Sequence, residues 1–481
     1  MSHLHRTTPD TAHHPPAPQE DTATRRPGLL LAVLCLAQFM LILDVTVVNV
    51  ALPDMAADLA LGRETLTWVV TAYTLCFGGL MLLGGRLADA LGAHRTVLAG
   101  LAVFTAASLV SGLATGAPML LTGRTLQGVG AALMSPAALS IVTTGFHSEA
   151  RNKALGVWAA IGGTGSAVGV LLGGALTDGP GWKWVFYINV PVGAFALAVL
   201  PALLPKRPAR PARLDVPGAL LATTGTASLI YGLVKAGDTG WGSAAAVLPL
   251  LGSLLLYGVF VAVERRSRVP LMDLRMFTRR PVVAGVFLML TATALLIAYF
   301  FLSSVYLQHV RGFSPLRTGL VFLPVAVATG LGAHLGSRLV GRIGSRATAV
   351  AGMAVAAAGT VPLTTLSAGA GVYAAVVPGL AVASFGLGAV LVTATTTALA
   401  MVAHEEAGLA SGVVNTFHEV GGSIGVAVMS TVAASGIDHG TAAGFSDAFT
   451  FGAVAAAASA LVALVLVPRG RPQVPPGMTM H

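Results

Sequence analysis

Charged residues are scarce in this chain. Asp, Glu, Lys and Arg make up 10% of its 481 residues, whereas they make up about a quarter of an ordinary soluble protein. Hydrophobic residues make up 55%, and uncharged apolar runs of about 18 residues or more, each able to span a bilayer, recur along the chain. This composition excludes a soluble globular fold. We therefore predict an all-α, multi-pass membrane protein.

Cysteines and catalytic motifs are scarce as well. The two cysteines, Cys35 and Cys76, both fall in apolar runs, so neither a disulfide framework nor a metal-binding CxxC pair is available. There is no Walker A loop, no HExxH and no His/Cys cluster at metal-ligand spacing. The carboxylates in the apolar runs are dispersed rather than paired for acid–base chemistry. We therefore expect no enzyme activity, no metal and no cofactor, and a membrane enzyme or channel is the weakest alternative.

The polar tail at residues 1–28 has no apolar segment of the kind found in signal peptides, so we expect no cleavable signal. It contains His3, His5, His13 and His14. A metal site is one interpretation of these histidines, but their composition favours a disordered tail. The net charge of +9 would suggest nucleic acid as the partner of a soluble protein. Here the positive charges lie in short loops between apolar runs, so we expect no nucleic-acid partner.

Fourteen apolar segments of about 20 residues can be counted. They lie at 29–52, 65–84, 96–115, 118–144, 154–176, 184–204, 216–236, 243–263, 281–308, 315–337, 347–367, 371–402, 410–434 and 446–467. With fourteen spans both termini lie on the same side. The tails and every second loop hold 22 Lys and Arg residues, and the alternate loops hold five. The positive-inside rule therefore predicts cytoplasmic termini in the cytoplasmic membrane, and the Ala, Gly and Arg content suggests a bacterium.

Two of the basic loops are similar. The loop RLADALGAHR (86–95) follows the second span, and RLVGRIGSR (338–346) follows the tenth. The offset of eight spans predicts two pseudo-symmetric six-helix halves, 29–204 and 281–467, separated by a basic linker and two inserted helices (205–263). Parallel halves with a substrate site between them near the midplane are a transporter architecture.

The basic loop between the inserted helices and the second half, residues 264–280, places Leu271, Leu274 and Phe277 at helical spacing. This pattern is typical of an interfacial helix on anionic lipid, so membrane lipids are expected partners. The sequence is equally compatible with a solvated cytoplasmic loop. The residues after the last span, 468–481, form a cytoplasmic tail.

Five motifs give the chain a family resemblance. They are GRLADALGAHR (85–95), RTLQGVGAA (124–132), LDVTVVNVALP (43–53), WVVTAY (68–73) and WKWVFYINVPVG (182–193). In this order and on these segments they resemble the major facilitator superfamily, specifically its fourteen-helix drug:proton antiporter branch. One motif differs from the pattern of this branch: the stretch 165–174 has Val170 where the antiporters have proline. The glycines that allow helices to approach closely remain, but the proline kink does not.

The resemblance implies proton-coupled efflux of hydrophobic or cationic drugs by alternating access, with the proton gradient as energy source and the monomer as functional unit. A dedicated exporter of one endogenous metabolite is the first alternative. A proton symporter is a weaker one, which Val170 keeps open. The resemblance also implies a conformational role for the loop residues Gly85, Asp89, Gly92 and Arg95, with Asp89 opposing a helix N-terminus.

Asp44 and Arg124 are charges inside apolar segments. Asp44 lies nine residues before Pro53, or about 13 Å below the end of its segment, and Arg124 lies about 9 Å below the same surface. Intramembrane charges usually pair or line a water-filled cavity. We predict that the two meet in the central cavity, where Arg124, a proton or a cationic substrate neutralises Asp44 in turn. A permanent ion pair that fixes two helices is the alternative.

Further site residues are predicted with less support. Glu419, about 13 Å from the cytoplasmic end of its segment, is a second candidate for proton coupling together with His418. Four aromatic side chains are candidates for the wall of a pocket for lipophilic cations, and two polar ones could add contacts. They are Phe39, Trp158, Tyr299 and Tyr306, with Gln127 and Asn415. Each aromatic residue could instead pack between helices.

Overall fold

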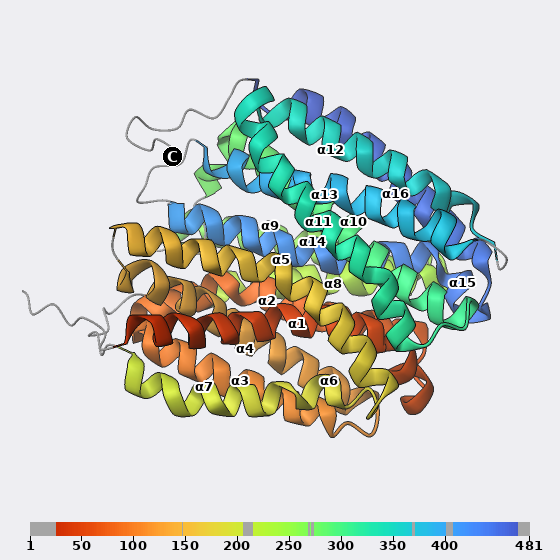
Figure 1. The fold of residues 1–481 in the computed structure, drawn as a ribbon. Coiled ribbons are helices and arrows are strands. Elements are labelled where there is room, and N and C mark those ends of the chain that lie inside the picture. The colour runs from red at the N-terminus through yellow and green to blue at the C-terminus, as the bar shows by residue number, and fades with distance from the viewer. Residues whose placement is uncertain are drawn as a thin grey trace, which may run out of the picture.

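The computed structural model describes residues 26–146, 148–204, 215–267, 270, 274–367, 371–400 and 407–469. All regular structure in these residues is helical (Figure 1). The helices of the first half are α1 (Pro27–Leu59), α2 (Arg63–Leu91), α3 (Ala93–Gly112), α4 (Ala117–Gly145), α5 (Ser148–Asp178), α6 (Trp184–Tyr187) and α7 (Asn189–Leu203). The inserted pair is α8 (Val216–Thr239) and α9 (Ala244–Arg266).

The second half consists of η1 (Leu274–Thr278), α10 (Arg280–Val305), η2 (Tyr306–Val310), α11 (Pro315–Ile343), α12 (Ser345–Thr360), η3 (Val361–Thr365), η4 (Val372–Val376), α13 (Val377–Leu399), α14 (Ala407–Val432), α15 (Ala434–His439) and α16 (Ala442–Leu466). Over the described residues, twelve helices are long and apolar enough to cross a membrane. With α5 and α14, of 31 and 26 residues, they account for the fourteen predicted segments. The predicted all-α membrane fold is confirmed.

The two halves have the same packing plan. In the first, α2 and α3 pack against α4, and α1 packs against α5. In the second, α11 and α12 pack against α13, and α10 packs against α14. The similar loops adopt the same backbone: Gly92 precedes α3 with φ +92°, and Gly344 precedes α12 with φ +85°. Glycine is suited to both positions because side chains rarely tolerate such φ values. The predicted repeat is therefore visible in the structure.

The halves meet along two lines, α2 against α14 and α5 against α11. We call the end of the bundle where α1 begins the terminal end; Arg280 and Arg346 bond there to the last carbonyls of α16, those of Leu466 and Val467. The opposite end is the far end. Close to it, Ser304 donates to the Asn49 carbonyl at 2.6 Å.

A second set of bonds closes the far end. Gln308 donates to the Val50 carbonyl at 2.7 Å, and Arg63 donates to the Ser430 carbonyl at 3.4 Å. On the other line, a Cβ added to Gly174 would lie 2.7 Å from the Pro315 carbonyl oxygen, so α5 and α11 are in backbone contact. In this conformation the two halves are held together at the far end.

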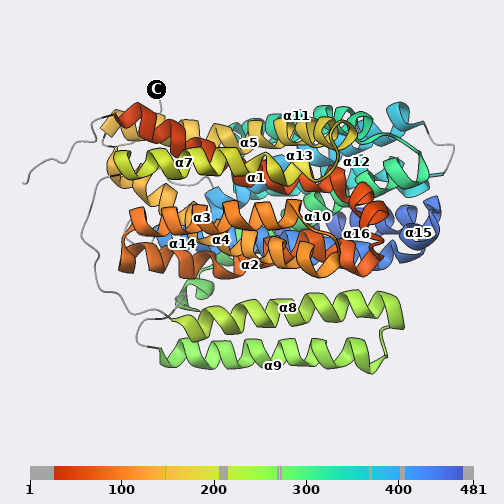
Figure 2. The ribbon, with the colours of Figure 1, turned by 90° about the horizontal axis from the view of Figure 1, so that it is seen from below.

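The inserted helices lie beside the bundle, with α9 outermost and α8 next to it (Figure 2). The inner helix α8 packs against both α2 and α14, where Leu75, Ile230, Val234 and Ala427 form a small buried cluster. The outer helix exposes four leucines, Leu248, Leu251, Leu254 and Leu255. Such an apolar face is suited to lipid. The hairpin therefore contacts both halves rather than one.

The segment 264–280 packs partly on the bundle. Its described part forms the short helix η1, in which Met276 is buried. Phe277 lies edge-on to Phe417 of α14, with ring centroids 6.2 Å apart, and Pro270 accepts a hydrogen bond from Arg86 at 3.2 Å. The described part of the segment therefore packs on the bundle, and its expected position at the membrane surface stays a prediction. Leu271, the tail histidines and the linker at 205–214 lie outside the described residues.

Candidate functional site

Asp44 is fully buried in the continuous helix α1. Its Oδ2 atom accepts a hydrogen bond from Arg124 Nη1 at 2.5 Å, and the Arg124 side chain is 1% exposed. The two intramembrane charges of the first half therefore form a buried ion pair between α1 and α4. A buried pair is stable only when its remaining hydrogen-bonding capacity is also met.

The second carboxylate oxygen of Asp44 is held by two amides. Gln127 Nε2 donates to Oδ1 at 2.9 Å, and Asn189 Nδ2 donates to the same atom at 3.1 Å. Gln127 was predicted as a polar contact for substrate; in this structure its amide contacts the ion pair. Both oxygens of Asp44 are thus occupied by protein donors.

Asn189 is a functional candidate that the sequence did not single out. It begins α7, which continues α6 through Ile188 with helical backbone angles, so the two form the one span predicted at 184–204. Pro191 lacks the N–H that would bond to the Tyr187 carbonyl, so one backbone hydrogen bond is missing at this point of the span. The only signal in the sequence was the place of Asn189 inside the motif 182–193, without any indication of its partner.

A second layer of contacts fixes Arg124. Its Nε donates to the Val69 carbonyl at 2.9 Å, and its guanidinium carbon lies 4.5 Å from the centroid of the Tyr73 ring. Gln127 also donates to Ser108 at 2.9 Å. Hydrogen bonds to charged groups contribute about 1.5–3 kcal/mol each. The arrangement holds a charge pair in one defined geometry.

All these partners belong to the first half. They lie on α1, α2, α3, α4 and α7, and Asp44 has no exposed surface. The pair is therefore enclosed within one bundle in this conformation, rather than facing a cavity between the halves. A proton or a cation can reach Asp44 only after Arg124 or one of the two amides moves.

Glu419 has a different environment. It is 9% exposed and lies on α14 against α2, where a Cβ added to Gly78 would be 2.5 Å from the Glu419 Cβ. Among the described residues no hydrogen bond to its carboxylate is present. One turn away, Thr74 and Ser423 hydrogen-bond across the same line of contact at 2.6 Å. Glu419 is thus a carboxylate at the junction of the two halves.

His418 faces another helix. Its Nδ1 lies 3.0 Å from Thr293 Oγ1 and 3.4 Å from Met289 Sδ, both on α10. Successive residues of a helix point about 100° apart, so the imidazole and the Glu419 carboxylate are directed to different neighbours. The two were predicted side by side as a coupling pair, and the structure does not bring them together.

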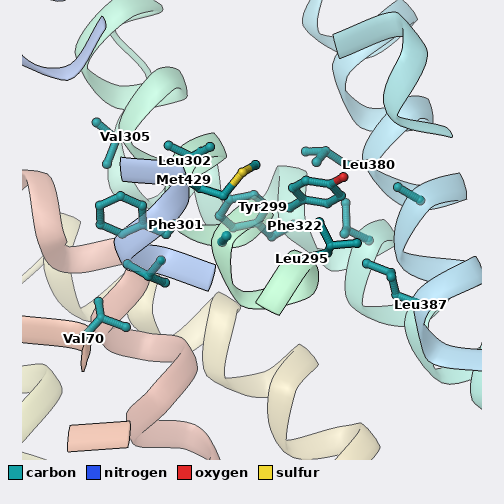
Figure 3. Close-up of a cluster of buried hydrophobic side chains, with 14 of the residues drawn as sticks. Val70, Leu295, Tyr299, Phe301, Leu302, Val305, Phe322, Leu380, Leu387 and Met429 are labelled. Atoms are coloured by element: carbon teal, nitrogen blue, oxygen red, sulfur yellow. The ribbon is translucent and has the colours of Figure 1, made fainter. Parts of the chain in front are cut away.

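Tyr299 and Tyr306 are fully buried in the second half. Thr360 donates to the Tyr299 hydroxyl at 3.1 Å, and the Tyr306 hydroxyl donates to the Ser367 carbonyl at 3.0 Å. Figure 3 shows Tyr299 among apolar side chains, including Leu295, Phe322 and Met429. Their placement corresponds to packing between helices, the alternative left open by the sequence.

The other residues predicted to contact substrate lie in different parts of the structure. Trp158 is partly buried against the core of the first half, and Phe39 lies on α1 facing Gly165 of α5. Asn415 is exposed on α14. The structure therefore does not gather the predicted wall residues around one cavity.

The loop residues lie at the terminal end. Asp89 and Arg95 are exposed, Gly85 is half-buried in the last turns of α2, and Gly92 forms the junction with α3. Over the described part of the chain no group of three or more His, Cys, Asp or Glu side chains is placed to hold a metal.

Known proteins are similar to this chain over most of its length. The model of the Major Facilitator Superfamily matches residues 34–426. A puromycin resistance protein of Streptomyces alboniger is 40% identical over 91% of this chain and 89% of its own length. A cephamycin export protein of Amycolatopsis lactamdurans is 38% identical over 95% of each chain. A multidrug resistance protein of Mycobacterium tuberculosis is 34% identical over 85% of this chain and 76% of its own.

Solved structures show the same fold. A POT family transporter crystallised with 5-aminolevulinic acid superposes with a TM-score of 0.67, covering 91% of this chain and 96% of the other. The identity between the two is 14%, so this likeness concerns the fold alone.

Proposed function

The chain belongs to the major facilitator superfamily, and on that premise we propose that it exports hydrophobic or cationic drugs and antibiotics in exchange for protons. The similar proteins named for puromycin resistance, cephamycin export and multidrug resistance support export of small molecules. The proton gradient supplies the energy without a bound cofactor, and each monomer is a complete unit.

The buried Asp44–Arg124 pair is the observation that carries the proton-coupled part of this proposal. A carboxylate in a membrane-spanning helix is costly and is usually functional. Asp44 has three side-chain donors, so neutralising it by protonation weakens three contacts at once. A proton arriving at Asp44 can therefore loosen α4 and α7 from α1, which links protonation to helix movement.

The distribution of Lys and Arg supports cytoplasmic termini in the cytoplasmic membrane of a bacterium. With that orientation the terminal end faces the cytoplasm and the far end faces outside. The bonds that close the far end then describe a state closed to the outside. In alternating access this is the state that receives substrate from the cytoplasm, and the loop at 85–95 lies at the end that must close next.

A dedicated exporter of one compound is the second candidate. Two of the similar proteins carry the name of one antibiotic each, puromycin and cephamycin. A broad exporter moves several unrelated cations, whereas a dedicated one moves a single chemical class. A competition panel with puromycin, a cephem and ethidium separates the two.

The test is uptake of ethidium by inverted membrane vesicles with an imposed proton gradient, acid inside. Native protein should accumulate the dye only with the gradient. Asp44→Asn should fold, as judged by gel filtration, and should lose the uptake. The control is Asp447→Asn, at an exposed aspartate of α16, which should transport like the native protein.

Equal transport by native protein and Asp44→Asn would overturn the role of Asp44. Absence of gradient-driven transport for every compound in the panel would overturn the export proposal itself. Ethidium movement in the same direction as the protons would show that the protein is a symporter rather than an antiporter.

A further inference from the structure

Tyr73 carries a buried hydroxyl group that the proposed mechanism does not yet use. Its side chain is fully buried on α2, and its hydroxyl has no hydrogen-bond partner among the described residues. Buried hydroxyls nearly always have a partner, so an exception needs an explanation. Tyr299 and Tyr306, the two comparable buried tyrosines, both have one.

Along α2, Tyr73 lies between the levels of two carboxylates. Four residues toward the far end, the Val69 carbonyl holds Arg124, the partner of Asp44. Five residues toward the terminal end, Gly78 contacts Glu419. At 1.5 Å per residue these levels are about 6 Å from Tyr73 toward the far end and about 7.5 Å from it toward the terminal end.

Three other helices carry charged groups around this part of α2. Arg124 of α4 lies over the ring of Tyr73 and is paired with Asp44 of α1, and Glu419 of α14 lies against Gly78 of the same helix. His418 on α14 points to α10 instead. On α2 itself, Cys76 faces Gly128 of α4.

The ring of Tyr73 is held, whereas its hydroxyl has no partner among the described residues. The Arg124 guanidinium lies over the ring face, a cation–π contact. The hydrogen bond between Thr74 and Ser423 fixes the register of α2 against α14. Tyr73 therefore packs with the first half and directly precedes Thr74, which contacts α14 of the second half.

We propose that Tyr73 is a relay residue that joins Asp44 and Glu419 across the junction of the two halves. The inference rests on the proposed proton-coupled transport. When Asp44 is protonated and released from Arg124, its O–H donates to the Tyr73 oxygen, and the Tyr73 O–H donates to ionised Glu419. Transfer along both bonds moves one proton from Asp44 to Glu419 and leaves the tyrosine neutral. The proton thereby advances from the far end toward the terminal end.

The variant Tyr73→Phe tests this relay because it keeps the ring and the contact with Arg124 but removes the hydroxyl. The matched control is Tyr299→Phe, which removes a buried hydroxyl from the second half. In vesicles, Tyr73→Phe should lose at least tenfold in gradient-driven ethidium uptake and in the accompanying proton release. Ethidium counterflow, which needs no net proton movement, should stay within twofold of native.

A second measurement does not depend on transport. The protonated-carboxyl bands of purified protein are titrated by infrared spectroscopy and assigned with Asp44→Asn and Glu419→Gln. In native protein the titration of one carboxyl should shift when the other is replaced. In Tyr73→Phe the two should titrate independently, whereas Tyr299→Phe should behave like the native protein.

Driven uptake within twofold of native in Tyr73→Phe would overturn the relay, as would carboxyl titrations that stay coupled without the hydroxyl. A native protein that shows no driven uptake refutes the proposed function instead, and the infrared titrations still decide whether Tyr73 joins the two carboxylates.

Discussion

The two halves share a backbone plan but differ in how they treat a buried carboxylate. In the first half Asp44 is surrounded by Arg124, Gln127 and Asn189, and both of its oxygens are occupied. In the second half Glu419 has no such donors among the described residues and lies where the halves meet. The aromatic residues of the second half pack as core.

The repeat therefore determines the backbone packing of the two halves but not the surroundings of their buried carboxylates. Matching glycines, Gly92 and Gly344, produce the same junction in both halves. The charge pair of the first half is an addition that stabilises one arrangement of α1, α4 and α7. Among the described residues the Glu419 carboxylate of the second half accepts no hydrogen bond, so a change in its protonation breaks fewer contacts.

Removing the charge of Arg124 should have the largest effect on stability. Arg124→Gln leaves Asp44 buried without its cation, and breaking a buried pair in this way costs about 3–5 kcal/mol. The midpoint of unfolding in detergent should fall accordingly. Arg338→Gln, at an exposed arginine, is the control and should leave the midpoint unchanged. An Arg124→Gln protein as stable as native would show that the pair is not a stabilising element.

Adding one methyl group at the junction should have the next largest effect. In Gly78→Ala the new Cβ would lie 2.5 Å from the Glu419 Cβ, which forces α2 and α14 apart. Overpacking of this kind costs about 1–3 kcal/mol. Unfolding in detergent measures it, with Gly341→Ala as the control because its added Cβ meets open space. Equal stability of the two variants would mean that the contact between the halves is looser than described.

The salt bridge to the inserted helix should contribute less. Lys235 and Glu64 are 2.7 Å apart, but their side chains are 22% and 36% exposed. Exposed pairs contribute about 0.2–1 kcal/mol. Lys235→Met should therefore lower stability by no more than this, and a double-mutant cycle with Glu64→Gln isolates the pair. A coupling energy above about 1 kcal/mol would place this pair among buried ones.

Glu419→Gln should have the smallest effect and sharpens the contrast with Asp44. The amide has the shape of the carboxylate but avoids the cost of burying a charge. Stability at neutral pH should be equal to or slightly above that of native protein, whereas Asp44→Asn should be destabilised because Arg124 loses its counter-ion. A clear loss of stability in Glu419→Gln would reveal a donor to that carboxylate.

The sequence was a good guide to the helices and a partial one to the site. Long apolar runs leave few alternatives in a membrane, because the backbone must satisfy its own hydrogen bonds. Depth along the helices also brought Asp44 and Arg124 to one level, and the structure shows them in contact. The rest depends on rotation about helix axes and on contacts between distant segments. Asn189 contacts Asp44 across 145 residues of sequence, and Tyr299 points into a core rather than a cavity.

The inserted helix α8 bridges the two halves at the α2–α14 contact but not at the α5–α11 contact. It is fastened to one half through Lys235 and Glu64, and to the other through the Leu233 carbonyl, which accepts a hydrogen bond from Thr431 of α14 at 2.9 Å. Separation of α2 from α14 therefore requires α8 to leave one of them or to slide. On the α5–α11 side no inserted helix bridges the two halves in the described part of the chain. The inserted helix therefore braces the α2–α14 contact and leaves the α5–α11 contact without such a brace.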